Sequence, residues 1–221
     1  MKDIFTKAAT ILTLTTFIAM SCDKPFQIEQ PLGVTTKVVN LQAKSGITPV
    51  VVYAAEGWTA QLTDNVEWAS IDRLEGYGLS EIKFAYSQNF GTARQVGIVF
   101  NSSKETPDTV MMVQESGNPS PIFQFTKGDI SVPKENAVIN LEFVTDLIYN
   151  IDEIIFDIKY DQNDTVDWLN NIRISADGVS CEVAENNSSI DRSAVLTLSL
   201  PEVTGKVHTT FMKIKQLTTS L

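Results

Sequence analysis

Few side chains in this sequence have the type and spacing that catalysis requires. The 221 residues include one histidine, His208, and two cysteines, Cys22 and Cys181. A zinc site needs several such ligands together, and the sequence has neither a CxxC pair nor the G-x-S-x-G motif of a hydrolase serine. Acidic residues are abundant, but no spacing marks two of them as a glycosidase pair. We therefore expect a protein that is not an enzyme and holds no metal ion or cofactor.

His208 and Cys181 have structural interpretations instead. His208 lies in GKVHTTF, where we expect a solvent-facing strand residue. Cys181 alternates with Val179 and Val183 in VSCEVAE, and a period of two places all three on one face of a strand. We expect that face to lie in the core, with Cys181 as a small apolar residue and not as a reactive thiol.

Cys22 indicates chemistry of a different kind. An uncharged run, residues 8–20, follows a weakly basic start and leads into IAMSC, with Ala19 and Ser21 at positions −3 and −1 from the cysteine. The run is too short to span a bilayer stably, but it suits a signal peptide. The junction resembles a bacterial lipobox, which implies cleavage before Cys22 and acylation of that residue. An ordinary secretory signal with a stray cysteine is the alternative.

Charge and cysteine count limit the partners. The formal net charge is −10, and removing residues 1–21, which contain two lysines and one aspartate, leaves −11. An acidic protein of this kind is not expected to bind nucleic acid or anionic membrane surfaces. We expect contact with the membrane only through the N-terminal lipid. If Cys22 is acylated, Cys181 has no partner for an intrachain disulfide.

Alternation of apolar and polar residues dominates the chain from Val34 onward. Short runs such as TPVVVYA and QVGIVFN are rich in β-branched and aromatic residues and end at turn-forming residues. Their recurrence every roughly 8–14 residues predicts an all-β sandwich or barrel of antiparallel strands. SGNPSP interrupts the pattern and indicates a linker. The predicted organisation is a signal peptide 1–21, a lipidated tether 22–33, a first β-sandwich 34–117, a linker 118–121 and a second β-sandwich 122–221.

The two halves repeat one set of landmarks. VEWAS at 66–70 and VDWLN at 166–170 each begin a series of the same four residue types in the same order. The series are Trp68, Asn89, Arg94 and Gln114 in the first half and Trp168, Asn186, Arg192 and Gln216 in the second. Such a repeat indicates duplication. We expect each Trp to fill the space between two sheets, and each Asn to sit in a turn because Asn tolerates left-handed dihedrals. We expect each Arg to cover apolar surface with its stem while its head stays in water, and each Gln to form hydrogen bonds with strand backbone.

This pattern, with GWTAQLTDNVEWASI, NFGTARQVGIVF and TVMMVQESG, resembles the BACON domain. The second half is divergent: it keeps VDWL, NNSSIDRSAVLTL and IKQLT but lacks a glycine after Gln216. The resemblance implies two tandem immunoglobulin-like antiparallel β-sandwiches in a lipoprotein of the outer membrane of Bacteroidota, on its periplasmic or cell-surface face. It also implies a non-catalytic, glycan- or mucin-associated binding module. A structural spacer or assembly component that contacts another surface protein is the alternative.

Three aromatic residues are candidates for sugar binding, because an exposed ring can stack on a sugar face. Tyr77 in EGYGLS and Phe90 in NFGT lie in glycine-flanked loops, where exposure is expected. Trp58 follows AEG and is expected at the edge of a loop. These residues are the predicted binding positions.

Two threonines are candidates for modification. DTV occurs twice and resembles the motif at which Bacteroidota O-glycosylate exported proteins, which makes Thr109 and Thr165 candidate acceptors. The alternative is that each DTV simply begins a strand, with the aspartate ending a turn before two β-branched residues.

Overall fold

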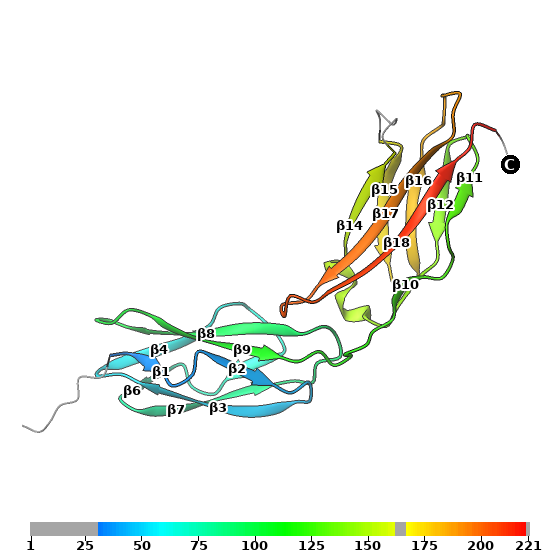
Figure 1. Ribbon diagram of the computed structural model, residues 1–221. Coiled ribbons are helices and arrows are strands. Elements are labelled where there is room, and N and C mark those ends of the chain that lie inside the picture. Colours follow the sequence, from blue (N-terminus) through cyan, green and yellow to red (C-terminus); the bar gives the residue numbers. More distant parts are fainter. Residues whose placement is uncertain (1–30, 162–166, 220–221) are drawn as a thin grey trace, which may run out of the picture.

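The computed structural model describes residues 31–161 and 167–219, which form two β-sandwiches joined end to end with their long axes inclined to each other (Figure 1). Every strand pairing in these ranges stays within residues 33–114 or within residues 123–216. Each sandwich also has its own cluster of buried apolar side chains. The all-β fold predicted from the alternation is confirmed. No helix among the described residues has the length and apolar character needed to cross a membrane.

The first sandwich packs a four-stranded sheet against a five-stranded sheet. The four-stranded sheet has the order β1 (Gly33–Val34), β3 (Gly46–Tyr53), β7 (Ser80–Tyr86) and β5 (Ala69–Ile71). The five-stranded sheet has the order β2 (Val38–Leu41), β9 (Asp108–Gln114), β8 (Arg94–Ser102), β4 (Gly57–Leu62) and β6 (Glu75–Tyr77). Alternate residues of each strand face the core, as the period of two requires; in β8 these are Val96, Ile98 and Phe100.

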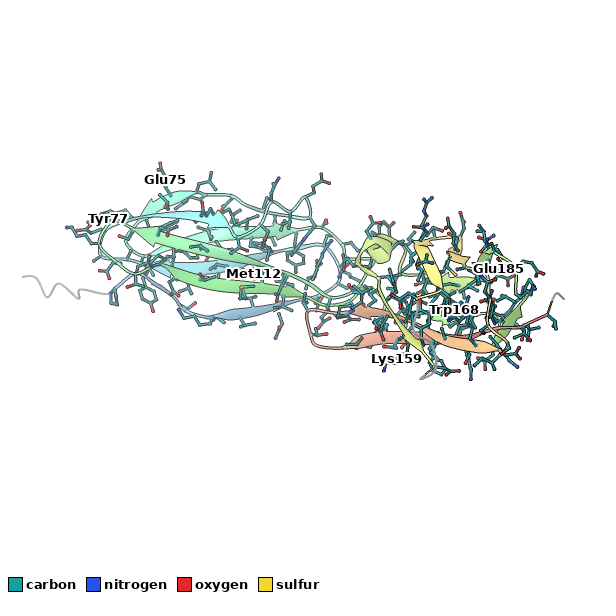
Figure 2. The ribbon with its side chains drawn as sticks, turned by 90° about the horizontal axis from the view of Figure 1, so that it is seen from above. Glu75, Tyr77, Met112, Lys159, Trp168 and Glu185 are labelled. Carbon is teal, nitrogen blue, oxygen red and sulfur yellow. The ribbon has the colours of Figure 1, made fainter. Side chains whose placement is uncertain are left out.

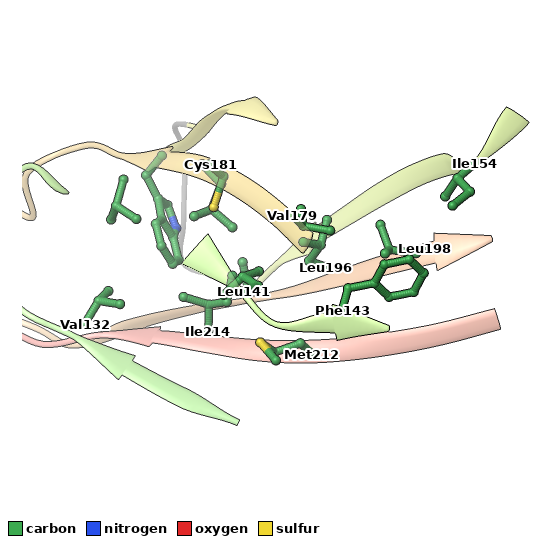
Figure 3. Packing of buried hydrophobic residues seen from close by; sticks show 14 of the residues in the cluster. Val132, Leu141, Phe143, Ile154, Val179, Cys181, Leu196, Leu198, Met212 and Ile214 are labelled. Carbon is green, nitrogen blue, oxygen red and sulfur yellow. The ribbon is translucent and has the colours of Figure 1, made fainter. Parts of the chain in front are cut away.

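The second sandwich is built from three sheets, of two, four and three strands. They are β10 (Phe123–Phe125) with β13 (Phe143–Thr145); β11 (Ile130–Val132), β18 (Val207–Gln216), β17 (Arg192–Pro201) and β14 (Ile155–Tyr160); and β12 (Ala137–Leu141), β16 (Gly178–Val183) and β15 (Leu169–Ser175). A 3-10 helix, η1 (Ile148–Glu153), precedes β14 and was not anticipated from the sequence. Figure 3 shows Cys181 of β16 across the core from Met212 and Ile214 of β18.

The pairing is not purely antiparallel. β2 runs parallel to β9, and β11 runs parallel to β18, in equivalent positions of the two sandwiches. Alternation of apolar residues determines which face of a strand is buried but not the direction of the strand, so these parallel pairs could not be predicted from it.

The fold begins inside the predicted tether 22–33. Leu32 is buried in the first core, and Gly33 pairs with Tyr53. These last two residues of the predicted tether are therefore part of the first sandwich. Cys22 lies outside the described residues.

Arg94, Gln114 and Trp68 form one connected unit in the first sandwich. Arg94 Nε donates to Gln114 Oε1 at 2.8 Å, and the guanidinium lies 4.3 Å from the centroid of the Trp68 ring. Gln114 is fully buried, and its Nε2 donates to the backbone carbonyls of Ala43 and Ser87 at 3.2 and 3.0 Å. Burial lowers the pKa of Arg94, so its head is not simply held in water as the sequence suggested.

The second sandwich repeats this unit. Arg192 Nε donates to Gln216 Oε1 at 2.7 Å, and the guanidinium lies 4.9 Å from the centroid of the Trp168 ring. Gln216 Nε2 donates to the backbone carbonyls of Lys134 and Ala184 at 3.0 and 2.9 Å. The predicted repeat therefore holds at the level of individual hydrogen bonds.

Two details of the predicted landmarks are wrong. Neither Asn89 nor Asn186 has a positive φ. Both are buried, and the Nδ2 of each donates to a backbone carbonyl, at 2.7 and 3.0 Å respectively, so their role in these turns is hydrogen bonding. Trp168 is fully buried between sheets as expected, whereas Trp68 is only partly buried under its arginine.

Cys181 is buried, and the side chain of His208 is mostly covered. Cys181 is a core residue, as predicted, and burial raises the pKa of its thiol to about 11, which keeps it protonated at neutral pH. The expectation that His208 faces solvent is wrong. Its side chain is 9% exposed, and Nε2 lies 2.6 Å from Oε1 of buried Glu202 across the β17–β18 hairpin. A buried carboxylate needs such a partner, but the sequence does not show that these two residues face each other.

Candidate functional site: a groove on the first sandwich

A groove of about 640 Å³ lies across β6, β4 and the end of β8. Figure 2 shows Glu75 and Tyr77, which border it, at the end of the first sandwich that is remote from the second. β1, the first strand, lies at the same end (Figure 1). The groove is therefore built by the edge of one sheet and does not involve the second sandwich.

Strand register arranges the outward side chains of the groove. Thr59 of β4 pairs with Glu75 on one side and with Asn101 on the other. A carboxylate, a hydroxyl and an amide thus lie side by side. Two residues earlier in β4, Gly57 pairs with Tyr77. Because Gly57 has no side chain, the tyrosine ring borders open space beside this polar row.

The side chains of this polar row have no hydrogen-bond or ion-pair partner among the described residues. Among the described residues, the side chains of Glu75, Thr59 and Asn101 make no hydrogen bond or ion pair with one another or with any neighbour. Carboxylate and amide oxygens accept hydrogen bonds, and the amide and hydroxyl also donate. The row therefore offers acceptors and donors on a rigid sheet, ready for an external partner.

Tyr77 has the exposure predicted for it. Its side chain is 72% exposed, and Leu74 and Leu79 beside it are also exposed. Gly78, with a φ of 62°, forms the turn that follows β6, a conformation that side-chain-bearing residues rarely adopt. Three exposed apolar side chains therefore lie within six residues along this edge of the sheet, and Tyr77 is the one that lines the groove.

The prediction that Trp58 stands exposed at a loop edge is wrong. Trp58 is 2% exposed and packs edge-on against Phe100, with ring centroids 5.7 Å apart. Its indole covers Gly76, where an added Cβ would lie 2.3 Å from Cζ2. The alternation of Trp58 and Ala60 with outward Thr59 in WTAQL was the signal that places it in the core. Trp58 supports the groove from below and is not available for stacking.

Two buried polar atoms lie beneath the groove without partners. Trp58 Nε1 and Ser102 Oγ make no hydrogen bond to any described residue, and the two residues are directly opposed on β4 and β8. An unsatisfied buried group of this kind costs about 1–3 kcal/mol. Both atoms belong to residues that line the groove.

Phe90 is exposed, as predicted, but it lies apart from Tyr77, at the joint between the two sandwiches. Its ring is 6.0 Å from that of Tyr149 in η1. Nearby, the backbone N–H of Thr92 donates to Oδ1 of buried Asn150 at 3.1 Å. Phe90 therefore takes part in the contact between the two sandwiches.

Of the two candidate glycosylation sites, only Thr109 lies within the described residues. It is partly buried in β9, and its backbone N–H donates to Oδ1 of Asp108 at 2.8 Å. The same carboxylate accepts from the backbone N–H of Val34 at 2.9 Å and pairs with Lys37. Asp108 thus has a structural role that explains this copy of DTV, while modification of Thr109 stays a prediction. Thr165 lies outside the described residues.

Comparison with known proteins gives no assignment from sequence, since no family model and no curated protein matches the chain. No group of three or more potential metal ligands gathers in the described ranges. A GH5 xyloglucanase of Bacteroides ovatus, solved with a XXXG heptasaccharide, is 12% identical over 50% of this chain and 30% of that chain, with a TM-score of 0.36. Human protocadherin-24 EC1-2 is 14% identical over 85% of this chain and 99% of that chain, with a TM-score of 0.32. The titin domains z1z2 in complex with telethonin are 11% identical over 87% of this chain and 95% of that chain, with a TM-score of 0.33.

Proposed function

We propose that this protein is a non-catalytic, lipid-anchored protein of the cell envelope that binds glycans in the groove bordered by Tyr77. The observation that carries the proposal is the exposed tyrosine beside an unused row of Glu75, Thr59 and Asn101. A sugar ring has an apolar face and a rim of hydroxyls. An aromatic ring binds the first, and carboxylate, hydroxyl and amide groups bind the second.

A panel of immobilised glycans tests this proposal. The purified protein is expected to be retained by at least one glycan, and Tyr77→Ala should weaken that binding by roughly tenfold or more, the order of a lost aromatic contact in a small site. Phe211→Ala is the matched control, because Phe211 is 68% exposed on β18 of the second sandwich and should leave binding unchanged. No retention at millimolar glycan, or equal loss in both variants, would contradict the proposal.

The proposed anchor rests on the lipobox-like IAMSC and on the BACON-domain resemblance. Because β1 and the groove share one end of the first sandwich (Figure 1), an anchored molecule would carry the groove on its membrane side and the second sandwich farther out. Cys22→Ala is expected to abolish labelling by a fatty-acid probe in cells and to release the protein from the membrane fraction. Labelling that persists in this variant would disprove the lipobox interpretation.

The joint supports a second candidate function, a spacer that holds another surface protein. The hydrogen bond from Thr92 to Asn150 and the contact of Phe90 with Tyr149 tie the two sandwiches together. A fixed orientation suits a spacer, and a failure of every glycan on the panel would favour this function over the first.

A further inference from the structure

Glu75 sets the charge of the groove. Among the described residues that line it, Glu75 is the one that carries a carboxyl group, and none is a lysine, arginine or histidine. Lys104, which follows the lining residue Ser103, is paired with Glu56, and this hydrogen bond and charge raise the pKa of Lys104. Lys104 is therefore already paired with a carboxylate of its own, and the residues that line the groove contribute one acidic group and no basic one.

We propose that the groove selects uncharged glycan chains and that Glu75 is the specificity-determining residue that rejects sialylated, sulfated or uronic-acid sugars. This inference rests on the proposed function and narrows its ligand class. Thr59 stands between Glu75 and Asn101 in the cross-strand row, so a ligand that uses the row is brought within contact of the carboxylate. A hydroxyl there donates a hydrogen bond to Glu75, whereas an anionic group meets a like charge.

The size of this discrimination follows from Coulomb's law. Two like charges about 5–7 Å apart near a protein surface repel each other, and at low ionic strength the repulsion corresponds to a preference on the order of tenfold for the neutral ligand. Salt at about 0.5 M shortens the screening length to a few ångström and should remove most of that preference. The rest of the acidic molecule adds to the repulsion at low salt, so a substitution is needed to locate its source.

The experiment uses the purified protein and a panel that holds each neutral oligosaccharide beside its sialylated, sulfated or uronate-bearing form. The wild-type protein should bind the neutral member of a pair roughly tenfold more tightly at low salt. Glu75→Gln keeps the size and one hydrogen-bond acceptor, so neutral binding should change by less than roughly threefold while the preference falls to near unity. The thermal unfolding temperature should not change, since Glu75 is exposed and unpaired.

The first of three outcomes contradicts only the inference, and the other two also contradict the function on which it rests. The inference is overturned, and the proposed function stands, if the protein binds through Tyr77 but binds neutral and anionic members equally. The same holds if Glu75→Gln keeps the preference for the neutral member. Binding that survives Tyr77→Ala places the ligand elsewhere and overturns both. Absence of binding to any pair also overturns both. If Glu75→Gln does not fold, Glu75→Ala also removes the charge and supplies the same comparison of neutral and anionic members.

Discussion

Replacing Gln114 with alanine is expected to lower the free energy of unfolding of the first sandwich by about 3 kcal/mol. Gln114 is fully buried, accepts a hydrogen bond from Arg94 and donates to the carbonyls of Ala43 and Ser87. Alanine removes all of these bonds and leaves Arg94 Nε without its acceptor, while the carbonyls of Ala43 and Ser87 each keep one donor, the N–H of Asn89 and Arg94 Nη2. The loss of stability is larger than that for an ordinary hydrogen bond because the donor that loses its acceptor belongs to a charged guanidinium.

The matching substitution Gln216→Ala should cost the second sandwich about as much, because its bonds to Arg192, Lys134 and Ala184 repeat the first set. Denaturant-dependent amide hydrogen exchange measures the two sandwiches separately in each variant. Each substitution should lower protection in its own sandwich, and exposed Gln61→Ala should change it by less than about 0.5 kcal/mol. A loss below about 1 kcal/mol at either glutamine would show that the unit does not stabilise the fold as described.

Gly76→Ala is expected to destabilise the first sandwich by about 2–3 kcal/mol. The new Cβ would lie 2.3 Å from Cζ2 of Trp58, and the indole cannot retreat because it packs against Phe100. Either β6 moves away from β4 or the core around Trp58 is distorted. Equilibrium unfolding in urea, followed by tryptophan fluorescence, gives the change in free energy.

Gly128→Ala is the control for that substitution. No atom lies within 4 Å of a Cβ added at Gly128, and its φ is not in the left-handed region, so alanine should be neutral or slightly stabilising. If Gly76→Ala were as stable as wild type, the close packing of Trp58 under β6, and with it the rigid floor of the groove, would be wrong.

The sequence was enough to predict the strands and the repeat but not the edges of the sheets. Alternation located strands such as β8 and β17 because one face of each is buried along its whole length. The parallel direction of β2 and the 3-10 helix η1 had no comparable signal. The pair His208–Glu202 was missed because a hairpin brings together residues that look like ordinary surface positions in the sequence.

The candidate site was predicted only in part. Tyr77 could be identified because glycines on both sides indicate an exposed turn. Its polar neighbours could not, since the row of Glu75, Thr59 and Asn101 depends on the register of three strands that are far apart in the chain. Trp58 was misplaced because its position after a glycine outweighed the alternation that puts it in the core.

The most direct test of the groove as the ligand site is an NMR titration of the isotope-labelled protein with a neutral glycan retained on the panel. The backbone amide signals of Gly57, Thr59 and Tyr77 are expected to shift with a common dissociation constant, while that of Phe211 in the second sandwich stays in place. Shifts confined to residues 123–216 or to the joint around Phe90 would contradict the account, as would a titration in which no amide of the groove moves.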